Sequence, residues 1–351
     1  MFEDGYVMWI LFGVFVGAAL AVDLGILGAL RRTVLGRGQT AATSSSPIAE
    51  HDNHHPPPSS HHQTGAFRQG LIWTIVWIGL AAIFAVIILI EMGYDKMLEF
   101  VTGYAVEKSL SVDNMFVFLL IFSSLGIPHA FQHRVLSAGI LSAIAMRIPL
   151  IVVGASLLET FHWMVYLFGG MLVLTAARMM LQKKEKKIEV EKNIAVRMLR
   201  RILPVSTELH GGKFLARING TLYATALLVA LVIIEVTDLV FAIDSIPAVL
   251  AITTDQFLVI TSNIFAILGL RSLYFLLAGM MEKFRYLKPA LVALLLFIGV
   301  KMVLSEVFHI PVVASLAVIA AILGGALVLS VIRAKKEQSS QQLAKSHDLE
   351  K

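Results

Sequence analysis

Long runs of apolar residues recur along the chain, and each is long enough to cross a membrane as a helix. A helix needs about 20 mainly apolar residues to span the hydrocarbon core of a bilayer. Nine segments meet that length: 8–30, 71–90, 97–122, 135–157, 161–181, 221–250, 257–281, 288–307 and 311–332. The first run is too long for the apolar core of a signal peptide, and further runs follow it. The pattern therefore predicts an all-α, polytopic membrane protein with about nine transmembrane helices.

Composition narrows the class of protein further. Of the 351 residues, 57% are hydrophobic and only 15% are charged, whereas soluble domains carry about a quarter charged residues. The chain has no cysteine, which excludes disulfides, thiolate metal sites and thiol nucleophiles. It contains neither a Walker-type phosphate loop nor the Gly-x-Gly-Asp string of intramembrane aspartyl proteases. We therefore expect neither an enzyme nor an ATP-driven pump.

The basic residues predict the orientation of the chain in the membrane. Of the 29 Lys and Arg residues, 23 lie in segments that are cytoplasmic if the N-terminus is outside, and only Lys96 lies in an outer segment. Cytoplasmic loops carry an excess of Lys and Arg in membrane proteins. We therefore predict an outer N-terminus and a cytoplasmic C-terminus. The net charge of +5 then needs no nucleic-acid partner, and the lipid bilayer is the expected partner.

The spans and the segments between them predict eight regions along the chain. They are a first transmembrane helix (1–30), a cytoplasmic Ser/Pro/His-rich loop (31–70), a second helix with an outer loop (71–96), a first three-helix repeat (97–181), a basic cytoplasmic linker (182–220), a second three-helix repeat (221–307), a ninth helix (308–332) and a cytoplasmic tail (333–351). The histidines of 38–65 either bind metal weakly or belong to a loop without that role. In the linker, Asn219-Gly220 predicts a hairpin turn.

Polar residues recur in the same order in the two three-helix regions. The pairs are Glu107 with Asp238, Asp113 with Asp244, Asn114 with Ser245, Arg147 with Arg271, and Arg178 with Lys301. Since each unit has three spans, the second enters the membrane from the opposite side. We therefore predict an inverted-topology 3+3 repeat of spans 3–5 and 6–8, an architecture that places a substrate site near the membrane midplane. The alternative is a chance likeness between apolar helices.

Six carboxylates lie inside the predicted spans, where each charge costs ~3 kcal/mol on insertion scales. They are Asp23, Glu107, Asp113, Glu235, Asp238 and Asp244. We predict that they line an ion path, with Arg147, Arg271 and Lys301 as structural charge partners. Asp23 is equally compatible with a role in helix packing. Positions six apart on a helix differ by about 120°, so either the helices of Glu107 and Asp238 break or the two acids on each helix meet different neighbours.

The candidate ligands all offer oxygen atoms, from these carboxylates and from Asn114, Ser245 and Thr237. Oxygen ligands suit hard divalent cations such as Mg²⁺, Ca²⁺ and Mn²⁺. The absence of cysteine argues against Zn²⁺ or Cu⁺ as the main cargo. The residues alone therefore predict a site for a hard divalent cation.

Four strings carry a resemblance to a known family. Residues 107–118, 204–210, 235–249 and 261–271 resemble the TerC/Alx family of integral membrane proteins, which is named for tellurium resistance. The resemblance covers residues 7 to about 304, and only the stretched loop 38–65 departs from the family pattern. It implies a multi-pass protein of the bacterial inner membrane that exports Mn²⁺ as cargo and holds no prosthetic group. The metal site that it implies comprises Glu107, Asp113, Asn114, Glu235, Asp238, Asp244 and Asp23.

The leading prediction is therefore a transporter that exports Mn²⁺ through an acidic midplane site between two inverted repeats. Two alternatives stay open at this point. The intramembrane cations Arg147, Arg271 and Lys301 would suit a tellurite or other oxyanion transporter, and a membrane scaffold without transport would need no ion path. The sequence does not predict the coupling ion, the selectivity for Mn²⁺ over Ca²⁺ and Mg²⁺, or the oligomeric state.

Overall fold

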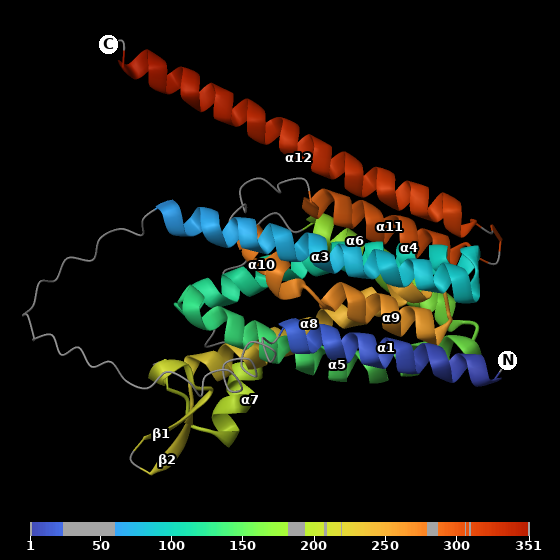
Figure 1. Ribbon diagram of the computed structural model, residues 1–351, viewed down its shortest axis with the longest axis horizontal. Coiled ribbons are helices and arrows are strands. Elements are labelled where there is room, and N and C mark those ends of the chain that lie inside the picture. Colours follow the sequence, from blue (N-terminus) through green and yellow to red (C-terminus); the bar gives the residue numbers. More distant parts are fainter. Residues whose placement is uncertain are drawn as a thin grey trace, which may run out of the picture.

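The computed structural model describes residues 2–23, 60–181, 194–206, 209–218, 220–278, 287–305, 307–308 and 310–349, and it is almost entirely helical. The long helices are α1 (Phe2–Asp23), α3 (Ser60–Met92), α4 (Tyr94–Ser124), α5 (His129–Thr160), α6 (Met164–Leu181), α8 (Ala226–Leu250), α11 (Leu287–Val303) and α12 (Val312–Leu349). Figure 1 shows that they lie side by side in a bundle. Within a helix, backbone groups form their hydrogen bonds inside one segment, as a lipid environment requires.

Five helices are long and apolar enough to span a membrane: α3 (over 68–92), α5, α6, α8 and α12 (over 312–330). A sixth span results if α9 (Gln256–Ile267) and α10 (Leu270–Ala278), which are bent by 41° at their junction, count as one. The predicted spans 8–30, 97–122 and 288–307 fall on α1, α4 and α11, which are not among these helices. The structure therefore supports a multi-pass membrane protein with five or six candidate spans, and the count of nine remains a prediction.

The predicted helix 257–281 is not continuous in the structure. Gly269 separates α9 from α10 and adopts φ +81°, a left-handed conformation that glycine adopts readily and other residues avoid. A Cβ atom at this position would lie 2.6 Å from the indole ring of Trp77. Helix α8, which carries Asp238, is unbroken although it contains Pro247. The chain is therefore broken between α9 and α10 and not within α8.

The predicted start of the sixth span at residue 221 is also wrong. Residues Thr221–Ala224 form strand β2, which pairs antiparallel with β1 (Leu215–Ile218), and α8 begins only at Ala226. Ile218 and Thr221 are opposite each other in the register, and Gly220 adopts φ +83°. The hairpin predicted from Asn219-Gly220 is therefore confirmed, and it ends the linker.

The linker carries a small subdomain at one end of the bundle (Figure 1). It comprises α7 (Ile194–Ile202), the single turn η3 (His210–Gly212) and the β1–β2 hairpin, and α7 packs against α8. Of the predicted loop 31–70, residues 31–59 lie outside the described part of the chain. Helix α3 begins at Ser60, well before the predicted span at residue 71, and α12 continues past the predicted end at residue 332.

Three helix pairs build the centre of the bundle. Helix α4 packs against α9, α5 against α8, and α6 against α11. The α6–α11 contact is close where Gly169 and Gly299 face each other. A Cβ at Gly169 would lie 2.9 Å from the Gly299 carbonyl oxygen, and a Cβ at Gly299 would lie 2.9 Å from the Gly169 carbonyl oxygen. Small residues let helix backbones approach in membranes. These pairs bring the charged residues of α4, α5 and α8 together.

Candidate cation site

Arg147 joins three other helices in the middle of the bundle. This α5 side chain is only 2% exposed, and it binds Asp238 of α8 with two hydrogen bonds, Nε to Oδ2 at 3.1 Å and Nη2 to Oδ1 at 2.9 Å. Its Nη1 donates to Glu107 Oε1 on α4 and to Asn263 Oδ1 on α9, the latter at 3.1 Å. Bidentate arginine–carboxylate contacts are directional as well as strong. The guanidinium therefore fixes four helices relative to one another.

A cavity of about 330 Å³, lined by both apolar and polar side chains, lies between α4, α6, α8 and α11. Its polar lining residues are Asp113, Asn114, Thr175, Asp244, Ser245 and Lys288. The Thr175 hydroxyl donates a hydrogen bond of 2.9 Å to Asp244 Oδ1. The cavity thus brings one carboxylate from α4 and one from α8 to a shared space, which is large enough for several water molecules and also contains neutral side-chain oxygens.

Helix geometry explains why the acids separate into two groups. Helices α4 and α8 are unbroken, so residues six apart point about 120° away from each other. Glu107 and Asp238 face Arg147, whereas Asp113 and Asp244 line the cavity. The spacing predicted either broken helices or acids that meet different neighbours. The structure shows unbroken helices whose two acids meet different neighbours.

The other predicted residues lie elsewhere. Glu235 packs against Gly139 of α5, beside a cavity of about 20 Å³ that Arg271 also lines. Arg271 Nη1 donates to Ser137 Oγ at 3.2 Å. Lys301 is half-buried on α11. Asp23 is the last residue of α1, and its side chain lies outside the described part. Thr237 donates to the Ile233 carbonyl of its own helix at 2.7 Å.

Three residues of these two centres were not predicted as site residues. Asn263 supplies an amide oxygen to Arg147, Thr175 bonds Asp244, and Lys288 lines the cavity although it counts as a cytoplasmic charge. Neutral polar residues in apolar helices are common in packing contacts, so the sequence signal of Asn263 and Thr175 is weak. Asn263 could have been found, since it lies within one of the strings that carry the family resemblance.

The grouping of acids limits what the cavity can offer a metal ion. Within the described ranges, no three His, Cys, Asp or Glu side chains lie together in an arrangement that could hold a metal ion. The cavity provides two carboxylates and several neutral oxygen donors, together with Lys288. Such a set could contact a hard cation through its oxygen atoms.

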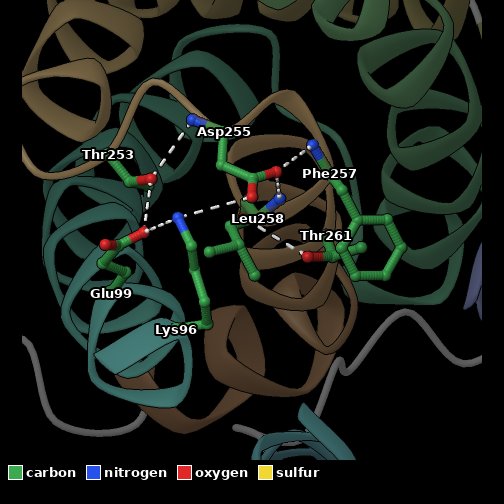
Figure 2. Close-up of polar contacts among 7 residues, drawn as sticks. All are labelled: Lys96, Glu99, Thr253, Asp255, Phe257, Leu258 and Thr261. Atoms are coloured by element: carbon green, nitrogen blue, oxygen red, sulfur yellow. Dashed lines mark hydrogen bonds and ion pairs between the residues drawn. The ribbon is translucent and has the colours of Figure 1, made fainter. Parts of the chain in front are cut away.

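A second polar cluster ties α4 to the start of α9 (Figure 2). Lys96 Nζ lies 3.0 Å from Glu99 Oε2 and 3.5 Å from Asp255 Oδ2. The Thr253 hydroxyl donates to Glu99 Oε2 at 2.7 Å. Asp255 caps α9 by accepting the backbone N–H of Phe257 at 3.0 Å, which satisfies a helix-end donor. The cluster therefore links the α8–α9 loop to α4.

The charge state of Lys96 is set by the same neighbours. Burial lowers the pKa of Lys96, but the hydrogen bond and charge of Glu99 and the charge of Asp255 outweigh it and raise the pKa above its ordinary value of 10.5. The ammonium therefore stays protonated across the neutral range, and the cluster remains bridged.

These features define a class of protein: a polytopic helical membrane protein that buries an arginine–carboxylate network and lines a cavity with acids from two of its helices. The model of the integral membrane protein TerC family matches residues 92–338. The chain therefore belongs to the TerC family of integral membrane proteins.

Curated relatives agree with this assignment. The "Uncharacterized membrane protein STKORF319" of Myxococcus xanthus is 47% identical over 274 residues, which cover 78% of this chain and 86% of the relative. Proteins named "Putative membrane-bound redox modulator Alx" are 42% identical over 277 residues in Photorhabdus laumondii, with 77% and 86% coverage, and 43% identical over 264 residues in Escherichia coli K12, with 73% and 82% coverage. No solved structure matches the chain.

Proposed function

We propose that this TerC-family protein is a secondary transporter that exports Mn²⁺, or a similar hard divalent cation, from the cytoplasm across the bacterial inner membrane. The observation that carries the proposal is the cavity that Asp113 and Asp244 line together. Two ionised carboxylates match the charge of one divalent cation. Asn114, Ser245 and Thr175 add neutral oxygens, the ligand type that hard cations prefer.

The other acids take a different part in this proposal. Glu107 and Asp238 are already bound by Arg147, so they set the geometry of α4 and α8 rather than contact the cargo. Glu235 and Asp23 remain predicted positions of the ion path outside the cavity. The site that we propose for the cation therefore narrows to Asp113, Asn114 and Asp244, with Thr175 and Ser245 beside them.

The arrangement of the helices supports the inverted repeat. If α4, α5 and α6 correspond to α8, α9–α10 and α11, a two-fold rotation exchanges the α4–α9 pair with the α5–α8 pair and maps α6–α11 onto itself. All three pairs pack together. The repeat-related acids Glu107 and Asp238 also share one arginine. We infer alternating access in which the two units move relative to each other around the cavity.

The two ends of the proposed path differ in this conformation. Lys288, at the cytoplasmic end of the predicted span 288–307, lines the cavity. On the predicted outer side, the cluster of Lys96, Glu99 and Asp255 joins α4 of one unit to the α8–α9 loop of the other. We infer that the cavity is reached from the cytoplasm and that this cluster closes the outer end.

The competing functions fit this geometry less well. An oxyanion would need available cations, but Arg147 is occupied by two carboxylates and acids outnumber the one lysine in the cavity. The redox name of the Alx relatives does not suggest thiol chemistry here, because this chain has no cysteine. A scaffold without transport stays as the outcome in which neutralising the acids changes nothing.

Expression in a bacterium that lacks its own Mn²⁺ exporters tests the proposal. The wild-type chain should lower intracellular manganese and restore growth in excess Mn²⁺, whereas Asp113→Asn and Asp244→Asn should each lose this effect while still inserting in the membrane. Asp95→Asn is the matched control, since Asp95 is exposed in the first turn of α4. Unchanged manganese content with the wild-type chain would contradict Mn²⁺ export, and tellurite tolerance without a change in manganese would favour the oxyanion alternative.

A further inference from the structure

The junction between α9 and α10 exposes backbone carbonyls inside the bundle. Helix α9 ends at Ile267, the chain turns at Gly269, and α10 begins at Leu270. The carbonyls in the last turn of a helix have no partner within that helix, and they carry the negative end of its dipole. Ala266 and Leu268 are both fully buried, so water has little access to them.

Lys108 of α4 supplies the missing partner. Its ammonium donates to the Ala266 carbonyl oxygen at 3.1 Å and reaches the Leu268 carbonyl oxygen at 3.5 Å. Carbonyls released by a broken membrane helix are a recurrent site for a coupling cation such as Na⁺. In this chain, a charged side chain occupies the position that such an ion would take.

The neighbouring charges add to the demand for a cation. Residue 107, next to Lys108, belongs to the Arg147 network, which contains two carboxylates and one guanidinium. The second carboxylate oxygen of Glu107 has no hydrogen-bond partner among the described residues. Asn263 connects the same network to α9. Helix α9 is therefore held by two cations, Arg147 through a side chain and Lys108 through backbone carbonyls.

We propose that the Lys108 ammonium is a tethered substitute for a monovalent inorganic cation at the α9–α10 break. Because the substitute is covalently attached, the protein keeps the broken helix in place without binding Na⁺ or K⁺. Removal of the lysine turns the break into a site for one of these ions. For transport, the proposal means that export does not depend on Na⁺ or K⁺, and this consequence rests on the function proposed above. The ion site itself does not rest on that function.

Thermal unfolding of the purified full-length protein in detergent tests the ion site without a transport assay. The wild type, Lys108→Ala and the control Lys301→Ala are melted in sodium, potassium and choline chloride at equal ionic strength. Lys301 is also a lysine of an apolar helix, α11, and does not lie at the break. Alanine at position 108 removes the charge and vacates the volume of the lysine side chain beyond Cβ, so that the carbonyls can bind an ion in its place.

The proposal predicts that Lys108→Ala melts about 3 °C or more higher in sodium or potassium chloride than in choline chloride, as expected for an ion that binds the folded state. The wild type and Lys301→Ala should show no such difference. A Lys108→Ala variant that aggregates in choline chloride but stays monodisperse with Na⁺ or K⁺ also supports the proposal. Equal behaviour of this variant in all three salts, folded or aggregated, would overturn it, whether or not the protein transports Mn²⁺.

Discussion

Arg147 determines how the acids of two neighbouring helices are oriented. Its guanidinium binds Glu107 and Asp238 from two helices, and each of these acids lies six positions before an acid of the cavity. Burying charges is costly, and a buried pair stabilises only when its geometry is good and its hydrogen bonds are made. The bidentate contact with Asp238 meets that condition, so the arginine can hold α4 and α8 with their second acids turned toward the cavity.

Replacement of Arg147 should therefore be severe. We expect Arg147→Met to lower the stability of the folded protein by about 3–5 kcal/mol, because it leaves two buried carboxylates without their cation. Thermal unfolding in detergent measures the loss. Arg217→Met is the control, since Arg217 lies in the exposed hairpin. If the two variants melt alike, Arg147 does not support the bundle in the way described.

At the residue scale, the sequence identified charged positions much better than it identified their partners. An acid or an arginine in an apolar helix is conspicuous because it is costly, and this singled out Arg147, Asp113 and Asp244. Thr175 and Asn263 are neutral and resemble ordinary packing residues. Their roles depend on contacts between α6 and α8 and between α5 and α9, which no local pattern encodes.

Among the elements, the α9–α10 break is one that the apolar pattern did not predict. Apolar runs predicted most helices well, since length and hydropathy are local properties of the chain. The break depends instead on one glycine and on its fit against Trp77 of a distant helix. A glycine within an apolar run is tolerated in many membrane helices, so the sequence did not distinguish a break from a continuous span.

Gly269→Ala tests this reading of the break. We expect a loss of about 2 kcal/mol or more, because a left-handed residue with a Cβ costs ~1–2 kcal/mol and the new atom would also collide with Trp77. The melting temperature in detergent reports the effect. Gly324→Ala on α12 is the matched control, since a Cβ there has no atom within 4 Å. Equal melting temperatures would show that residue 269 does not need its positive φ.

For the whole molecule, the account depends on two three-helix units that enclose one cavity. The repeat was suggested by polar residues in matching order, and the packing of α4 with α9 and of α5 with α8 supports it. The contact between Lys96 and Asp255, which we propose closes the outer end, was not predictable, because these residues lie far apart in the sequence and each one alone is typical of a solvated loop charge.

Breaking the contact between Lys96 and Asp255 should make the cavity accessible from the outer side of the membrane. In the cysteine-free chain, Leu110→Cys places one thiol on the cavity wall. We expect an impermeant thiol reagent to label it from the cytoplasmic side, and the added change Lys96→Gln to increase labelling from the outside. Lys213→Gln, in an exposed position of the linker, should have no effect. If Lys96→Gln leaves labelling from the outside unchanged, the cluster does not close the cavity.

The central claim is that Asp113 and Asp244 hold a divalent cation on its way out of the cell. The most direct measurement is Mn²⁺ uptake into inside-out membrane vesicles, where export from the cytoplasm becomes accumulation inside the vesicle. The account predicts uptake with the wild type, background uptake with Asp113→Asn and with Asp244→Asn, and wild-type uptake with Asp95→Asn. Wild-type vesicles that take up no Mn²⁺, or Asp113→Asn and Asp244→Asn vesicles that take it up as well as the wild type, would contradict it.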